Sequence, residues 1–242
     1  MNFVIKLENQ IITSLKELGE KMHLYEDASE KLLTSPKFLK FLKENDINKF
    51  NRLIELNHRV REHEEFIFLA QYIFNPVMNI RHHGYVFNSF QELGQQIIDF
   101  GPDVDVYLKD FLKYKLLTQY MELMGFDKTD TNLYNKVIEL ELLYEENENK
   151  AYFLLGFTLS NCGIIKYCGK SYDDINLFFK EMAMNKNITS FFLLIDKSQY
   201  VISWLTYLGY EEEINKYQSI INLIDGLEEN YEYRTKISKM VK

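Results

Sequence analysis

The sequence predicts a mostly α-helical fold in which three related helical units form a stack, and each unit opens with either a short β-hairpin or a tight turn. Three observations support this prediction. Gly and Pro are scarce, with 10 and 3 among 242 residues, which disfavours turn-rich β folds. Apolar residues recur at helical spacing. Short sequence blocks also recur three times in the same order.

The opening block of each unit contains a turn signal. It reads IKLEN at 5–9, IRHHG at 80–84 and IKYCG at 165–169. Each block ends on Asn or Gly, which tolerate a positive φ and therefore favour a tight turn. Two short strands joined at this turn would form a hairpin, and a helix–turn–helix corner is the alternative.

A short helix is expected after each turn, because apolar residues recur every three positions there. The first two copies even share a sequence at this point, SLKELG at 14–19 and SFQELG at 89–94. A loop of variable length follows, and it contains Pro36 in the first copy and Pro102 in the second.

Two further blocks complete each unit. The first block reads FLKENDI at 41–47, YMELMGF at 120–126 and WLTYLGY at 204–210. We expect it to end a helix, with the leading aromatics Phe41, Tyr120 and Trp204 anchoring the cores of the units. The second block reads FNRLIEL at 50–56, YNKVIEL at 134–140 and YQSIINL at 217–223. These segments should be equivalent helices in which Ile54, Ile138 and Ile221 are all buried.

The last helices of the first two units run into apolar segments, at 66–74 and 151–159. Helices that are apolar all round are buried, so these segments should lie between neighbouring units. The third copy continues polar and charged instead, as an exposed terminal cap does. The predicted domains are therefore unit 1 at 1–76, unit 2 at 77–160, unit 3 at 161–232 and a basic C-terminal tail at 233–242.

The composition and charge of the chain limit the classes of function that it can have. The formal charge of −8 disfavours a broad nucleic-acid-binding surface, which needs clustered Lys and Arg. No apolar run approaches the ~20 residues of a membrane helix, and the N-terminus lacks a secretory signal. Two cysteines, Cys162 and Cys168, do not make a disulfide framework, and they are expected to be free and partly buried. A cytoplasmic protein without cofactors or a metal site is expected.

Acidic residues provide the predicted partner-binding site. They cluster near the ends of the predicted inter-unit helices, at Glu62, Glu64 and Glu65 and again at Glu145, Glu146 and Glu148. Equivalent faces of stacked units line up, so these side chains should form one acidic stripe that steers a basic partner protein. An ordinary solvated face is the alternative interpretation.

His82 and His83 are the most prominent candidates for chemistry. Adjacent residues of a regular element point in different directions, and a metal site needs further ligands. The equivalent positions in the other units are Leu7-Glu8 and Tyr167-Cys168. A turn that varies this freely suits a surface loop, so we expect neither metal binding nor catalysis here.

Arg52 and His58 form an Arg-x5-His pair. This spacing resembles that of the HEPN ribonucleases, which are also helical. The resemblance covers seven residues and implies that the pair would bind and activate the RNA 2′-oxygen and phosphate. The polar residue that usually follows the Arg in that family is here Leu53. Repeat architecture explains the same block, with Lys136 and Leu142 at the equivalent positions.

The leading functional hypothesis is a non-enzymatic protein–protein interaction module, because repeats occur here without a catalytic motif. A more specific alternative is that the chain is an inhibitor or adaptor, encoded by a phage or mobile element, that blocks a basic nucleic-acid-binding partner. The third hypothesis, from a different class, is a HEPN-like ribonuclease.

Overall fold

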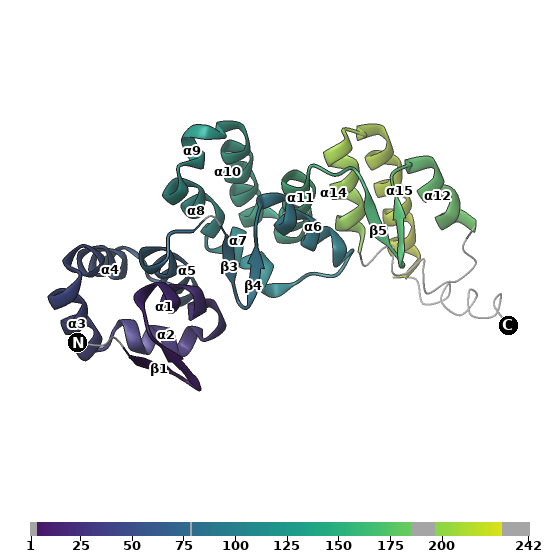
Figure 1. The fold of residues 1–242 in the computed structure, drawn as a ribbon. Helices are drawn as coiled ribbons and strands as arrows, with labels where there is room; N and C mark the ends of the chain where they lie inside the picture. The colour runs from purple at the N-terminus through teal and green to yellow at the C-terminus, as the bar shows by residue number, and fades with distance from the viewer. Residues whose placement is uncertain (1–3, 78, 185–196, 229–242) are drawn as a thin grey trace. The chain divides into compact units, whose positions relative to one another are not determined.

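The structure is a computed structural model that describes residues 4–77, 79–184 and 197–228. These residues are mostly helical, which confirms the predicted helical character, and their strands form three two-stranded antiparallel sheets (Figure 1). None of the described helices is both long and apolar enough to span a bilayer. The predicted basic tail at 233–242 lies outside the described residues.

The three hairpins divide the described elements into three successions, each of which is a hairpin followed by helices. The first comprises β1 (Ile5–Leu7), β2 (Gln10–Ile12), α1 (Leu15–Lys21), η1 (Met22–Leu24), α2 (Glu26–Leu33), α3 (Pro36–Asn45), α4 (Ile47–Arg59) and α5 (His63–Phe74). The second comprises β3 (Ile80–His82), β4 (Tyr85–Phe87), α6 (Phe90–Asp99), α7 (Val106–Lys113), α8 (Leu116–Met124), α9 (Phe126–Thr129), α10 (Thr131–Glu146) and α11 (Glu148–Ser160). The third contains β5 (Ile165–Tyr167), β6 (Lys170–Tyr172), α12 (Ile175–Met184), α14 (Ser198–Leu208) and α15 (Glu211–Glu228).

Each opening block forms a hairpin, so the helix–turn–helix alternative is wrong. The three pairs share one register, in which Ile5 pairs with Ile12, Ile80 with Phe87 and Ile165 with Tyr172. The turns contain residues with positive φ, as predicted for Gly84 and Gly169, but in the first turn the residue with positive φ is Glu8 and not Asn9. Besides Gly84 and Gly169, the non-glycine residues Glu8, His83 and Cys168 adopt φ values of 50°, 43° and 48°.

The chain divides into two compact units. One comprises residues 1–93 and 105–145, and the other comprises 94–104 and 146–242. The division passes through the predicted second repeat unit, whose elements are shared between the two compact units. Each compact unit has its own core.

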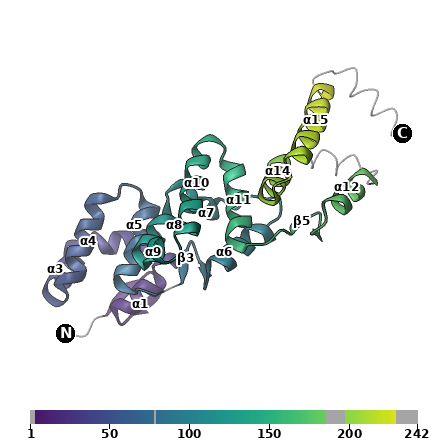
Figure 2. The same ribbon diagram turned by 90° about the horizontal axis from the view of Figure 1, so that it is seen from above.

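Helix α5 is the centre of the first compact unit. Every residue from Phe66 to Phe74 is buried, which confirms the burial expected for 66–74. The helix contacts α1, α2, α4 and α8, and Figure 2 shows α8 beside it. The ring of Tyr72 lies 5.2 Å from that of Tyr120 on α8. Helix α5 therefore joins elements from the first and second successions.

Helices α11 and α14 form the core of the second compact unit. All of 151–159 except Thr158 is buried, as predicted. Trp204 is 0% exposed, its ring lies 5.5 Å from that of Phe178, and its Nε1 donates a 2.7 Å hydrogen bond to the carbonyl of Gly163. Trp204 and Tyr120 are thus core anchors, whereas Phe41 is only half-buried.

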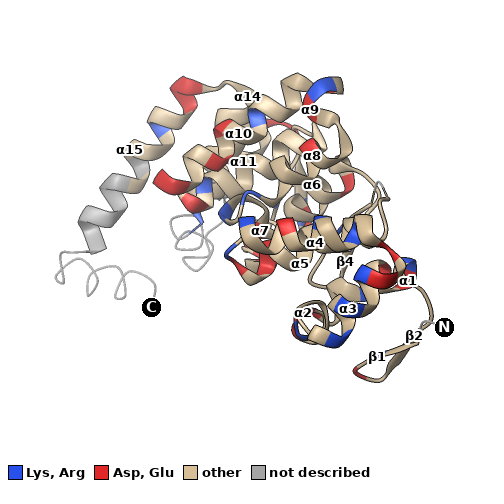
Figure 3. Cartoon of the chain, turned by 90° about the vertical axis from the view of Figure 1, so that its left-hand side faces the viewer, with Lys and Arg blue, Asp and Glu red and all other residues tan. Residues whose placement is uncertain are grey.

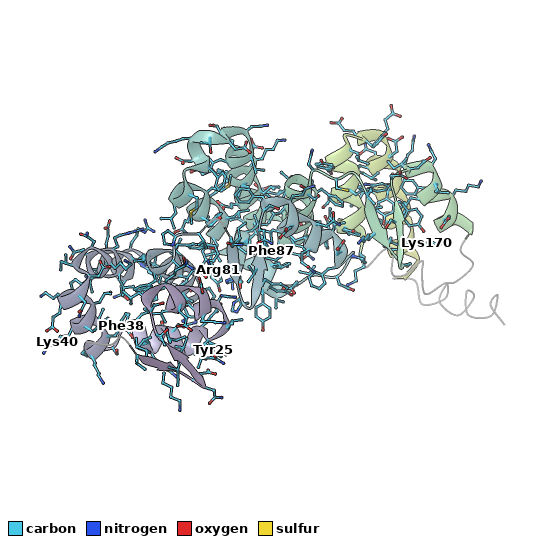
Figure 4. The ribbon with its side chains drawn as sticks, in the orientation of Figure 1. Tyr25, Phe38, Lys40, Arg81, Phe87 and Lys170 are labelled. Atoms are coloured by element: carbon cyan, nitrogen blue, oxygen red, sulfur yellow. The ribbon has the colours of Figure 1, made fainter. Side chains whose placement is uncertain are left out.

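Two glycines allow helices to cross at backbone contact. A Cβ on Gly19 of α1 would lie 2.6 Å from the carbonyl oxygen of Gln71 on α5. A Cβ on Gly94 of α6 would lie 2.7 Å from the carbonyl oxygen of Gly156 on α11 and would also meet the Ser160 nitrogen. Arg81, labelled in Figure 4, donates from Nη1 to the carbonyl of Gly19 at 2.9 Å. These are the glycines that end the shared SLKELG and SFQELG sequences.

The predicted burial of three isoleucines is wrong for two of them. Ile221 is 5% exposed, but Ile54 and Ile138 are half-buried. In α4 and α10 the fully buried side chains are those one residue earlier, Leu53 and Val137.

The starts of the helices also disagree with the predicted alignment of the third sequence block, at 217–223, with the blocks at 50–56 and 134–140. The first backbone hydrogen bonds of α4, α10 and α15 run from Phe50 to Asp46, from Tyr134 to Asp130 and from Ile214 to Tyr210. This register places Ile214, and not Tyr217, opposite Phe50 and Tyr134. Tyr217 then corresponds to the buried Leu53 and Val137. The shift is about one helical turn, over which an apolar pattern repeats.

Candidate functional site

The turn of the second hairpin places two adjacent histidines in different surroundings. His82 ends β3 and is 1% exposed, with its ring against those of Phe68 and Phe111 at 5.8 and 5.3 Å. His83 begins the turn and is half-buried. The surface-loop expectation is therefore wrong for His82, because the β3 register turns its side chain into the core.

Asp110 on α7 brings the two imidazoles together. Its Oδ2 lies 3.1 Å from Nε2 of His82 and 3.4 Å from Nε2 of His83. Helix α7 is fixed at its start by Asp105, whose Oδ1 accepts from the backbone nitrogens of Tyr107 and Leu108. Burial acts to raise the pKa of Asp110, but the hydrogen bonds from both histidines outweigh it, and the pKa is lowered.

Glu26, the first residue of α2, holds His83 from the other side. Its Oε2 lies 3.1 Å from Nδ1 of His83, and its Oε1 accepts from the His83 backbone nitrogen at 3.2 Å. Burial acts to lower the pKa of His83, but the hydrogen bond with Asp110 and the nearby carboxylates of Glu26, Asp110 and Glu64 raise it overall. The cluster therefore favours a cation at this position.

The cluster borders a groove of about 520 Å³ in the first compact unit. Its lining includes His23, Glu26, His63, Glu64, His83 and Tyr107. His23 is 6% exposed, and its Nδ1 has no hydrogen-bond partner among the residues that the structure describes. Burial, together with the charge of Arg81, lowers the pKa of His23 to about 4, so this imidazole is neutral at pH 7.

The arrangement offers metal-ligating atoms. One ligand atom from each of Glu26, His82 and His83 lies within 4.8 Å of the others, and Asp110 adjoins both histidines. Imidazole and carboxylate groups are the ligands that Zn²⁺ and related ions take in proteins. No metal site was expected from the sequence, but the structure brings these potential ligands together.

The sequence missed Glu26 and Asp110 because each is far from the histidines along the chain, by 56 and 28 residues from His82. No spacing motif connects them. A weaker signal was present, because all five histidines of the chain fall between His23 and His83. Three of them line one groove, and His82 lies directly beside it.

The acidic residues predicted to bind a partner differ in exposure. Glu62, Glu145, Glu146 and Glu148 are exposed, whereas Glu64 and Glu65 are half-buried. Glu145 lies 3.5 Å from the Lys115 Nζ. Glu62, Glu64, Glu65 and Glu145 belong to one compact unit and Glu146 and Glu148 to the other, so the continuous stripe remains a prediction.

Arg52 and His58 are both exposed on α4. Six residues of a helix turn through about 600°, so their side chains leave the axis about 120° apart. Arg52 lines a second groove, of about 320 Å³, with Arg59, Glu55, Gln119 and Glu122, and His58 does not line it. The structure thus gives the two residues different surroundings.

Two cysteines and several aspartates were also considered. Both cysteines are free, as expected, and Cys162 is half-buried, but the expectation of partial burial is wrong for Cys168, which is exposed in the turn between β5 and β6. Asp105, Asp130 and Asp174 accept hydrogen bonds from backbone nitrogens at the starts of helices. These side chains therefore cap the helices that they precede.

Comparison with known proteins gives no match: no family model, no curated protein and no solved structure is significantly similar to this chain.

Proposed function

We propose that this chain is a non-enzymatic protein–protein interaction module, built from three related helical units and working in the cytoplasm. The observation that carries the proposal is the recurrence of one arrangement. A hairpin of constant register precedes a helix three times. In the first two successions, that helix crosses the last helix of the succession at a glycine, Gly19 or Gly94. Stacks of such units commonly serve as binding surfaces.

The groove between α4, α5 and α8 is one feature that supports a binding role. Apolar side chains of Leu56, Leu69 and Ile73 line it together with the charged side chains of α4 and α8. Leu123, which also lines the groove, is 41% exposed. An apolar lining with a charged border is suited to the amphipathic helix of a partner.

The partner is proposed to be basic. The chain has a formal charge of −8, and its exposed carboxylates at Glu62, Glu145, Glu146 and Glu148 would steer a positively charged protein. Attraction of this kind acts mostly on the association rate and weakens as salt screens the charges.

Charge reversal tests the proposal. A partner identified by cross-linking in the native host would be purified, and its binding to the wild type and to the triple variant Glu145→Lys, Glu146→Lys, Glu148→Lys would be compared. We expect the variant to bind with an association rate about 10-fold or more lower at low salt, with its circular dichroism unchanged.

The matched control reverses three other exposed or half-exposed acids, Glu211, Glu212 and Glu213, at the start of α15 (Figure 3). It makes the same change in net charge at a different place. Equal loss in both variants would show that only net charge matters, and no loss in either would remove the acidic surface from the proposal. Cleavage of RNA that disappears in His58→Ala would overturn the non-enzymatic function.

A further inference from the structure

We propose that His82, His83 and Asp110 ligate a divalent transition metal ion of the zinc class, with Glu26 as a positioning carboxylate. The ligands come from separate segments: the turn of the second hairpin provides the histidines, α7 provides Asp110 and α2 provides Glu26. A bound ion would therefore clamp the β3–β4 hairpin to two helices. This inference does not depend on the proposed interaction with a partner.

The distances from Asp110 to the two histidines are close to those between the ligands of a tetrahedral ion. Metal–ligand distances of about 2.0–2.2 Å place neighbouring ligand atoms of a tetrahedral site about 3.3–3.6 Å apart. The Asp110 Oδ2 lies 3.1 Å from Nε2 of His82 and 3.4 Å from Nε2 of His83. The second distance lies within this range and the first is slightly shorter, so the Asp110 carboxylate would move slightly away from His82 when an ion binds.

Glu26 prepares His83 for this role. A metal-ligating histidine usually donates its other ring N–H to a carboxylate, which fixes the tautomer and the direction of the ring. The Oε2 of Glu26 lies 3.1 Å from Nδ1 of His83, so a proton on Nδ1 leaves the Nε2 lone pair toward Asp110. The carboxylates of Glu26 and Asp110 together offset the two positive charges of the ion.

The surroundings suit a site that is firmly held yet accessible. His82 is 1% exposed and packed against phenylalanine rings, which limits its movement. The His83 side chain is 23% exposed and borders the open groove, so an ion can enter there. Three protein ligands leave one coordination position toward this groove for water. The ligand set favours Zn²⁺ or Co²⁺ over Mg²⁺ and Ca²⁺, which prefer oxygen ligands.

Metal titration of the full chain tests the proposal. The probes are Zn²⁺ and Co²⁺ alone, added to tag-free protein that has been treated with a chelator. Both cysteines are first replaced, as Cys162→Ser and Cys168→Ser, because free thiols also bind Zn²⁺. We expect one equivalent of Zn²⁺ per chain, a visible Co²⁺ spectrum of tetrahedral type, and no binding of Mg²⁺ at the same concentration.

Variants then locate the site. Asp110→Asn and His83→Asn should each weaken Zn²⁺ affinity at least 10-fold, and Glu26→Gln should weaken it about 10–100-fold. Asn is chosen at position 83 because it tolerates the φ of 43° found there. The matched control is His63→Asn, which alters a half-buried histidine of the same groove that lies 3.0 Å from Glu30 and outside the cluster.

The proposal is overturned if Zn²⁺ binds no tighter to this protein than to Asp110→Asn, or if only His63→Asn weakens binding. If the variants fail to fold, the Co²⁺ spectrum of the otherwise unchanged protein decides. A spectrum identical to that of aqueous Co²⁺ would show that the four residues form a hydrogen-bonded network without a metal.

Discussion

Glu141 is a buried carboxyl whose environment makes the stability of the protein depend on pH. It is 5% exposed on α10, and Thr118 Oγ1 donates to it at 2.8 Å. Burial raises the pKa of Glu141 to about 7, although Thr118 acts in the opposite direction. The folded state therefore holds this proton more tightly than the unfolded chain does.

We expect the free energy of unfolding to fall as pH rises from about 4.5 through 7, because the folded state must then bury a carboxylate. The full effect of Glu141 is about 3 kcal/mol, at 1.36 kcal/mol for each pH unit of displacement. Urea unfolding at pH 5 and pH 8 measures it. Glu141→Gln should flatten this dependence and stabilise the protein at pH 8.

Glu139→Gln is the control, because it makes the same change at an exposed position of the same helix. It should leave the pH dependence as it is in the wild type. If Glu141→Gln unfolds with the wild-type dependence on pH, the carboxyl is not the group responsible.

Single side chains were the features least well predicted from sequence. Adjacent side chains of a helix point in directions only about 100° apart, so two neighbouring apolar residues can both lie near the buried face. The apolar pattern alone therefore did not separate the buried Leu53 and Val137 from the half-buried Ile54 and Ile138. Glu141 shows the same limit. Its burial depends on Thr118 of another helix, which no local pattern records.

At the scale of elements, the crossings of α1 with α5 and of α6 with α11 depend on glycine. We expect Gly19→Ala and Gly94→Ala each to destabilise the protein by about 1–3 kcal/mol, because the added methyl group meets backbone atoms that cannot move aside separately. Denaturant unfolding of the two variants measures the loss.

Gly163→Ala is the matched control. A Cβ there would lie 3.1 Å from the end of the flexible Leu208 side chain, which can yield. Its cost should stay below about 0.5 kcal/mol, because the added methyl group meets only a side chain that can move. If Gly19→Ala and Gly94→Ala lower the free energy of unfolding by as little as Gly163→Ala does, the crossing helices can move apart at little cost.

Elements with strong local signals were predicted well. The turn residues and the short apolar stretches around them predicted the three hairpins, with a helix–turn–helix corner as the alternative, and the all-round apolar character of 66–74 and 151–159 predicted their burial. The alignment of the α15 sequence with those of α4 and α10 was predicted less well. An apolar pattern that repeats every helical turn also permits an alignment that is displaced by one turn.

At the scale of the whole molecule, the division into two compact units predicts that unfolding is not a single step. The one tryptophan of the chain, Trp204, lies in the second compact unit and reports on that unit alone. Circular dichroism reports on the helices of both. We expect the two signals to change at different denaturant concentrations.

The glycine variants sharpen this test, because Gly19 and Gly94 belong to different compact units. Gly94→Ala should lower the midpoint of the fluorescence transition, and Gly19→Ala should leave it in place while shifting circular dichroism. Coincident transitions in the wild type and in both variants would show that the chain unfolds as one cooperative body.

The candidate metal site could not be predicted from any single segment, because its residues meet only when the whole first compact unit is folded. The pair of histidines was visible in the sequence, but its interpretation relied on comparison with Leu7-Glu8 and Tyr167-Cys168, which have no imidazole. Only the packing of α2 and α7 against the second hairpin brings Glu26 and Asp110 to it.

The burial of every residue from Phe66 to Phe74 on α5 has a consequence for biosynthesis. Its residues become available for folding when the chain reaches Phe74, yet its contact with α8 requires synthesis through Met124, 50 residues later. At about 5–20 residues per second, the apolar surface of α5 that faces α8 stays uncovered on the ribosome for about 3–10 s. The nascent chain is therefore a candidate client for chaperones during that interval, before the ribosome has made the helix that covers it.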